Sequence, residues 1–149
     1  MTNRKIITYG CRLNIYESEV IQKHMDEAGL KNYILFNSCS VTNEAKKKVI
    51  NDIKKAKKIS PQKKIIVTGC ASQIDSEFFT NMTEVDHVIG NKEKMELNTY
   101  LSLKSSQIKN KISDIMQLKS IAPQFIKSFN NHSRAFIQIQ SGCDHRCTF

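Results

Sequence analysis

The fold is decided by the stretch KIIVTGC at residues 64–70, an apolar and β-branched run that closes on a glycine and a cysteine. Two earlier stretches have a similar design, KIITYGC at residues 5–11 and YILFNSC at residues 33–39. Their cysteines are 28 and 31 residues apart, and one strand–helix–strand unit takes about 30 residues. The sequence therefore predicts three successive parallel strands, over 5–9, 33–36 and 64–68. Each is followed at its carboxyl end by a thiol, and the first is expected to be buried on both faces.

The interval between the first two strands has helical periodicity. A helix is expected over 15–28, with Asn14 as its N-cap and Glu17 completing a capping box. Gly29 supplies the C-terminal stop. The remaining elements expected up to residue 103 are a helix capped by Thr42 or Asn43 and ending at Ile59, a short helix over 76–81, a strand over 85–89, and a helix from Gly90-Asn91 to Leu103.

Regular alternation of strands and helices predicts an α/β fold, a parallel sheet with right-handed crossovers and helices on both faces. This domain is expected over residues 1–103. Residues 104–133 are rich in Lys, Ser, Asn and Gln and predict a connector, with one helical stretch over 111–119. The alternating run RAFIQIQ at 134–140 begins a further strand. Because that strand has no partner in the sequence, residues 134–149 are expected to start a second, truncated domain.

Composition narrows the functional classes. The chain has 149 residues, a net charge of +9 and a pI of about 9.4, which favour polyanionic partners. Lysines concentrate at 46–58, where a solvated helix face is the alternative explanation. No apolar run approaches the ~20 residues of a membrane span, and the N-terminus lacks the apolar core of a secretory signal. We therefore expect a cytoplasmic protein whose five cysteines are metal or redox ligands.

Three thiols at the carboxyl ends of adjacent strands would share the crevice where α/β sheets bind ligands. Cys11, Cys39 and Cys70 are therefore candidate ligands of an iron–sulfur cluster with one iron left open. Two alternatives stay open. The cysteines are also explained as small buried side chains, or as zinc ligands with His24 or His87 as the fourth.

The last two cysteines, Cys143 and Cys147, lie in the segment SGCDHRCTF at 141–149, directly after the expected strand. This segment resembles the Cys-x-x-x-Cys-x-x-Cys loop of radical S-adenosylmethionine enzymes, whose third cysteine would fall just beyond Phe149. His145 is expected to be a loop residue and not a ligand.

Together the segments resemble the methylthiotransferase family. They are TYGCRLNIYESEVI (8–21), NSCSVTNEAKKKV (37–49), VTGCASQ (67–73), VIGNKEK (88–94) and RAFIQIQSGCDHRCTF (134–149). The resemblance implies a [4Fe–4S] cluster on Cys11, Cys39 and Cys70. It also implies a second cluster with S-adenosylmethionine, for which Cys143 and Cys147 are two ligands of an incomplete motif.

The resemblance further implies an N-terminal part of an enzyme that methylthiolates threonylcarbamoyladenosine beside the tRNA anticodon. Near alternatives are the branches acting on isopentenyladenosine or on a ribosomal protein, and a non-catalytic iron–sulfur or RNA-binding module. No catalytic residue is assigned within the chain. The chain alone is expected to be inactive, with tRNA as the partner of the full-length enzyme and a companion chain as one source of the missing barrel.

Overall fold

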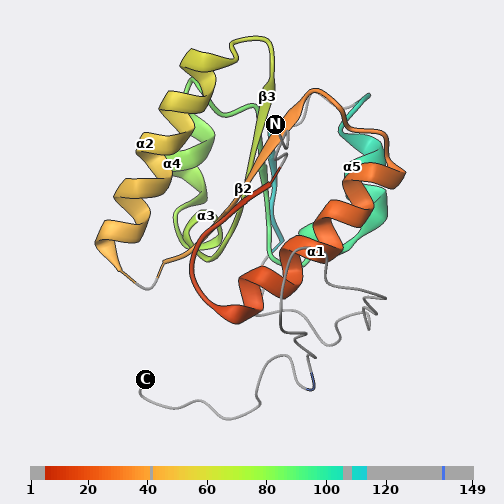
Figure 1. Cartoon of the computed structure of the whole chain (residues 1–149), viewed down its shortest axis with the longest axis horizontal. Helices are drawn as coiled ribbons and strands as arrows, with labels where there is room; N and C mark the ends of the chain where they lie inside the picture. The colour runs from red at the N-terminus through yellow and green to blue at the C-terminus, as the bar shows by residue number, and fades with distance from the viewer. Residues whose placement is uncertain (1–5, 41, 106–108, 114–138, 140–149) are drawn as a thin grey trace.

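Two six-residue strands, β2 (Tyr33–Ser38) and β3 (Lys64–Gly69), form the centre of a five-stranded parallel sheet in this computed structural model. They pair along their whole length, with Phe36 opposite Val67. Figure 1 labels these two central strands among the helices. Shorter strands complete the order β1-β2-β3-β4-β5: β1 (Ile6–Thr8), β4 (His87–Ile89) and β5 (Asn110–Lys111). The structure describes residues 6–40, 42–105, 109–113 and 139.

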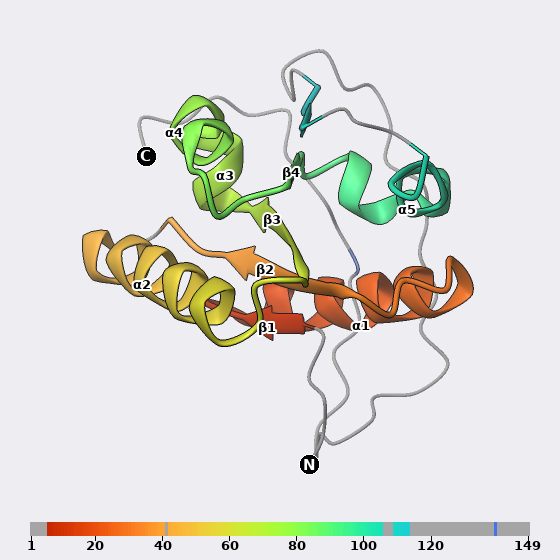
Figure 2. The ribbon, with the colours of Figure 1, turned by 90° about the horizontal axis from the view of Figure 1, so that it is seen from above.

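The helices follow the strands in chain order. They are α1 (Arg12–Glu27), α2 (Asn43–Ile59), α3 (Cys70–Ile74), α4 (Ser76–Asn81) and α5 (Leu97–Ser102), with a 3₁₀ turn, η1 (Glu93–Met95), before α5. Figure 2 shows α1 and α5 on one side of the sheet and α2, α3 and α4 on the other. The predicted α/β class, with a parallel sheet covered on both faces, is therefore confirmed.

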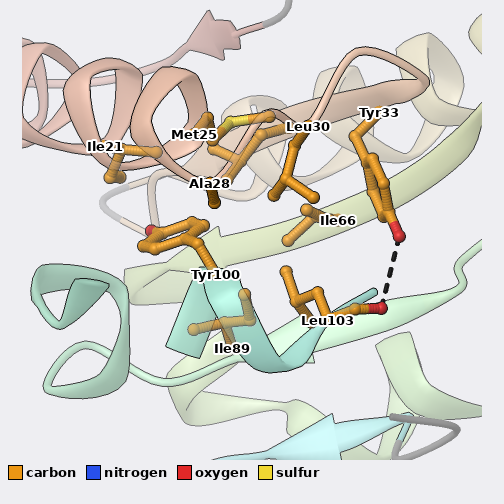
Figure 3. Close-up of a cluster of buried hydrophobic side chains, with 10 residues drawn as sticks. Ile21, Met25, Ala28, Leu30, Tyr33, Ile66, Ile89, Tyr100 and Leu103 are labelled. Carbon is orange, nitrogen blue, oxygen red and sulfur yellow. Dashed lines mark hydrogen bonds between the residues drawn. The ribbon is translucent and has the colours of Figure 1, made fainter. Parts of the chain in front are cut away.

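Alternation along the strands divides the core into two layers. On the first face, α1 and α5 pack on Leu35, Ile66 and Ile89, and the Tyr33 hydroxyl donates to the Leu103 carbonyl at 3.3 Å (Figure 3). On the second face, Phe36 and Val67 pack under α2, α3 and α4. Because both central strands are buried on both faces, their sequences are almost continuously apolar.

The hand of the crossovers differs from the prediction. The first two connections step across the sheet in the same direction, from β1 to β2 and from β2 to β3. Their helices nevertheless lie on opposite faces, because α1 packs in one core layer and α2 in the other. Two such crossovers have opposite hands, so the prediction that all crossovers are right-handed is wrong. The sequence pattern predicted parallel strands but did not specify their order in the sheet.

Several predicted boundaries also change. β1 is an edge strand, so Ile6 and Ile7 are half-buried and the expectation of burial on both faces is wrong. The helix expected up to Leu103 is interrupted at Glu96, whose extended backbone separates η1 from α5. Lys111, expected to begin a helix inside the connector, instead pairs with Ile89 as part of β5. The division into domains at residues 103 and 133 stays a prediction.

Candidate metal centre at the carboxyl-terminal edge of the sheet

Three cysteines follow the three neighbouring strands β1, β2 and β3. Cys11 is the N-cap residue of α1, Cys39 follows β2 directly, and Cys70 is the first residue of α3. Since these strands are parallel, all three residues lie at the carboxyl-terminal edge of the sheet. The structure thus places them at one edge, and their role as ligands stays a prediction.

The three thiols differ in exposure. Cys11 is exposed, Cys70 is partly exposed and Cys39 is 4% exposed. The Cys11 thiol donates to Asn14 Oδ1 at 3.7 Å. Within the described ranges, no three His, Cys, Asp or Glu side chains come close enough together to hold a metal ion. The donor chemistry and the shared edge fit an iron–sulfur cluster, whereas the side-chain conformations do not form a closed ligand set.

Glycines bring the turns after β1 and β3 against the end of β2. Gly10 has φ +94°, and a Cβ built on it would lie 2.7 Å from both Cβ and Sγ of Cys39. Gly69 has φ +96°, and its Cβ would clash with the carbonyl oxygen of Ser38. Only glycine combines this backbone with such a close approach. The residue before Cys11 and the residue before Cys70 are therefore both pressed against the Cys39 turn.

Buried amides and hydroxyls fix the same turns. Asn14 Nδ2 donates to the carbonyl oxygens of Tyr9 at 2.7 Å and Ser38 at 3.2 Å. Asn37 Nδ2 donates to the Asn14 carbonyl at 3.0 Å and to Ser18 Oγ at 3.1 Å. The predicted capping box is wrong, because α1 begins two residues before Asn14 and no side chain caps it. Asn14 instead satisfies backbone carbonyls of the β1 and β2 turns.

The sequence reasoning missed a buried ion pair beside this edge. Lys94 Nζ lies 2.6 Å from Glu17 Oε2 and donates to Asn91 Oδ1 at 2.8 Å. Burial raises the pKa of the Cys70 thiol; the Lys94 ammonium opposes the rise, and Glu17 and the other two cysteines add to it. Nothing in the local sequence NKEK at 91–94 distinguishes Lys94 from the exposed Lys92.

The histidines proposed as zinc ligands lie elsewhere. His87 begins β4, and its ring stacks on Tyr33 at the start of β2, with 6.3 Å between ring centroids, so it is at the amino-terminal edge. His24 packs between α1 and α5, with Nε2 3.2 Å from the Met95 carbonyl oxygen. Burial lowers the pKa of His24. Neither histidine lies with the cysteines, which removes the reason for choosing zinc over iron.

Helix α2 presents a row of lysines to solvent. Its apolar side buries Val49 and Ile53, and two of its lysines are paired, Lys46 with Asp75 and Lys57 with Asp86. Among the described residues, none of the other lysines of α2 has a carboxylate partner. We call these five exposed side chains the lysine stripe: Lys47, Lys48, Lys54, Lys55 and Lys58.

Other predicted features fall on residues that are not described. They are Cys143, Cys147, His145, the strand expected over 134–140 and most of the connector. In the part of the chain that the structure covers, no helix combines the length and the apolar character that crossing a bilayer requires.

An α/β domain with a thiol on each of three neighbouring strand ends defines the class of this protein. Residues 3–90 match the family described as uncharacterized protein family UPF0004. The chain belongs to that family.

Curated relatives are named as enzymes of tRNA methylthio modification. The chain is 50% identical over 146 residues to the threonylcarbamoyladenosine tRNA methylthiotransferase MtaB of Rickettsia prowazekii, covering 98% of this chain and 34% of the relative. It is 31% identical to the protein of that name in Thermotoga maritima, covering 100% and 35%. It is 30% identical to the tRNA-2-methylthio-N(6)-dimethylallyladenosine synthase of Desulfotalea psychrophila, covering 97% and 36%. The chain spans about a third of the length of these relatives.

Proposed function

We propose that this chain is the N-terminal, cluster-carrying part of a tRNA methylthiotransferase that acts on threonylcarbamoyladenosine. The observation that carries the proposal is the placement of Cys11, Cys39 and Cys70 at one edge of the sheet. The 50% identity to the Rickettsia relative supports the choice of substrate, since it covers nearly the whole chain. Because tRNA is modified where it is made and used, the proposal includes a cytoplasmic location.

Within this proposal Cys11, Cys39 and Cys70 hold a [4Fe–4S] cluster. Three thiolates suffice to hold a cubane while leaving one iron for another ligand. When bound, the cluster supplies the sulfur and redox chemistry that side chains lack. The chain itself contributes placement. Gly10 and Gly69 bring the three turns together, and Asn14 fixes the turn before Cys11 to the end of β2.

We propose that side-chain and turn adjustments close the ligand set when the cluster binds. Cys11 and Cys70 are accessible and would turn toward Cys39, which is buried against Gly10. Cys143 and Cys147 are proposed, from sequence resemblance alone, as ligands of a second cluster that binds S-adenosylmethionine.

The lysine stripe is the proposed contact with tRNA phosphates. Its residues recur along 12 positions of α2, which corresponds to about 16 Å of helix. Unpaired ammonium groups on a rigid helix can follow a phosphate backbone without reading sequence.

A second candidate is methylthiolation of dimethylallyladenosine, supported by the 30% identity to the Desulfotalea protein. Two chimeras distinguish the candidates. In each, this chain replaces the matching third of one relative, and the chimera is expressed in a bacterium that lacks methylthiotransferases. Mass spectrometry of tRNA nucleosides then detects each methylthiolated product.

We expect the chimera with the Rickettsia relative to make methylthiolated threonylcarbamoyladenosine, and its Cys39→Ala variant to make none. Higher activity of the chimera with the Desulfotalea relative would favour the dimethylallyl branch. Inactivity of both chimeras, with soluble protein present, would contradict the proposed enzyme and favour a non-catalytic module.

A further inference from the structure

The ion pair between Lys94 and Glu17 is almost completely buried. The Lys94 side chain is 2% exposed and the Glu17 side chain 13%. Removing two charges from water carries a large desolvation penalty, and a buried pair can often be replaced by apolar side chains without loss of stability. Stability is therefore a weak reason for an ammonium group at this position. The hydrogen-bond partners of Lys94 indicate a different role.

Lys94 connects two elements of the cysteine edge. Through Glu17 it is tied to α1, the helix that follows Cys11. Through Asn91 it is tied to α3, because Asn91 Oδ1 accepts from Lys94 while the Asn91 N–H donates to Gln73 Oε1 at 2.8 Å. Gln73 lies in α3, the helix that begins at Cys70. The chain of hydrogen bonds therefore runs from one cysteine-bearing helix to the other.

The backbone of Lys94 is anchored as well. Its N–H donates to the Gly90 carbonyl at 3.0 Å, and its own carbonyl accepts from the Tyr100 hydroxyl at 2.6 Å. Tyr100 is fully buried in the core layer formed with α1. The ammonium group is thus held by a rigid frame.

We propose that Lys94 is a positioning residue of the cysteine site. Held by Glu17 and Asn91, it fixes α1, which follows Cys11, relative to α3, which begins at Cys70, and it places a buried ammonium group between these two helices. Loss of this ammonium group with Glu17 retained would add net negative charge at the edge where thiolate and sulfide ligands would lie. The inference rests on the proposed cluster site and names a residue that supports it.

The test separates charge from stability with three variants. Lys94→Met leaves the Glu17 carboxylate buried without its partner. The double variant Glu17→Leu, Lys94→Met replaces the pair by apolar side chains and is expected to unfold near the parent temperature. Lys92→Met is the control, because Lys92 is exposed and only two positions away.

The first measurement uses the metal-free chain with Cys39, Cys143 and Cys147 replaced by Ser. A short bifunctional thiol reagent then reports the separation of Cys11 and Cys70. We expect several-fold less cross-linking in the double variant than in the parent and the Lys92→Met control. Equal yields would overturn the positioning role, and this result does not depend on whether the chain binds iron.

The second measurement uses chain reconstituted with iron and sulfide under anaerobic conditions. We expect the cluster of Lys94→Met to have a lower midpoint potential than that of the parent, because this variant loses a nearby positive charge while it keeps the Glu17 carboxylate, and added negative charge disfavours the added electron. Loss of iron to a chelator should be several-fold faster. A potential and a rate equal to those of the parent would show that Lys94 is only structural. A parent chain that takes up no iron would contradict the proposed cluster and leave the cross-linking result to decide on Lys94.

Discussion

Helices α1 and α2 connect successive pairs of strands, but they bury different chemistry. In α2 the buried residues are Val49 and Ile53, and the opposite side carries lysines. In α1 the first two turns bury the polar Asn14 and Ser18 as well as Tyr16, and apolar side chains make up most of the buried residues only further on. The difference shows that α2 follows the ordinary rules of an amphipathic helix, whereas the start of α1 is adapted to the cysteine edge.

The largest expected effect is the loss of metal from a variant in the turn that follows β2. Reconstituted parent chain should bind about four iron atoms, and Cys39→Ala should bind almost none while its circular dichroism stays that of a folded α/β protein. Cys147→Ala is the control, because this chain supplies only two cysteines around that position. Equal loss of iron from both variants would contradict the assignment of the three-cysteine site.

Asn14→Ala should weaken both the fold and the site. It removes the Asn14 donor from the carbonyl oxygens of Tyr9 and Ser38, and the loss of a buried hydrogen-bond partner costs about 1–3 kcal/mol. We expect a loss of about 2–4 kcal/mol in the free energy of unfolding, measured in urea, together with reduced iron uptake. The matched variant in α2, Asn51→Ala, removes an exposed amide and should change neither quantity. Similar losses from both variants would remove the distinction between the two helices.

Thr42→Ala tests the conventional start of α2. The Thr42 hydroxyl oxygen accepts from the Ala45 N–H at 3.1 Å, and loss of such a cap costs about 1 kcal/mol. We expect that loss in urea unfolding with unchanged iron content, and Thr42→Ser should restore stability. A drop in iron content as large as that of Asn14→Ala would show that α2 also supports the site.

Acidification should affect α1 through His24. Its Nε2–H donates to the Met95 carbonyl, and among the described residues its buried Nδ1 has no hydrogen-bond partner. Burial lowers the pKa of His24; Lys23 acts in the same direction, whereas the Met95 hydrogen bond and Glu27 oppose the shift. A histidine with a lowered folded pKa contributes stability above its unfolded pKa of about 6.5, and this is lost as pH falls through the folded value. The parent should lose stability as the pH falls from about 7 to about 5, a window that lies mostly below the unfolded pKa of histidine. We expect this loss to be smaller in His24→Gln. An unchanged slope would contradict this role.

The smallest expected effect on stability comes from the lysine stripe. Replacing Lys47, Lys54 and Lys58 by Gln should change the free energy of unfolding by less than about 0.5 kcal/mol, since all three are exposed. Affinity for tRNA should fall, and the slope of log K against log salt should become shallower by about 2, from three lost phosphate contacts at roughly 0.7 each.

The matched control replaces three exposed lysines outside α2, Lys31, Lys92 and Lys104, by Gln. It removes the same net charge from other elements. Binding curves that change equally in both triple variants would mean that tRNA responds to total charge and not to α2.

The contrast between α1 and α2 also explains what the sequence could predict. Thr42 as a cap and Ile59 as the last residue of α2 are confirmed, because capping and periodicity are local signals. Asn14 misled the prediction, since a cap and a buried amide bridge use the same residue type and differ only in tertiary partners. The predicted parallel pairing of β2 and β3 is also confirmed. It could be predicted because a strand buried on both faces leaves an apolar run in the sequence.

Long-range features were not predictable from such signals. The pairing of Lys94 with Glu17 joins residues 77 positions apart, a separation that no local sequence pattern specifies. β5 contributes only two residues, whose polar character is typical of an exposed edge and not of a strand. The shared edge of Cys11, Cys39 and Cys70 could be expected because it follows from strand polarity alone, whereas the conformations of their thiols could not.

The sequential order of the strands has a consequence for how the protein reaches its structure. Each strand pairs with the strand that precedes it in the chain, so every pairing closes a loop of one strand–helix–strand unit. Moderate sequence separation of contacts favours faster folding than long-range pairing does. β2, α2 and β3 share the longest register, so this unit is expected to form the folding nucleus. During synthesis, the remaining strands and helices would then pack onto this nucleus. The cysteine edge would be complete once the chain up to residue 90 has left the ribosome.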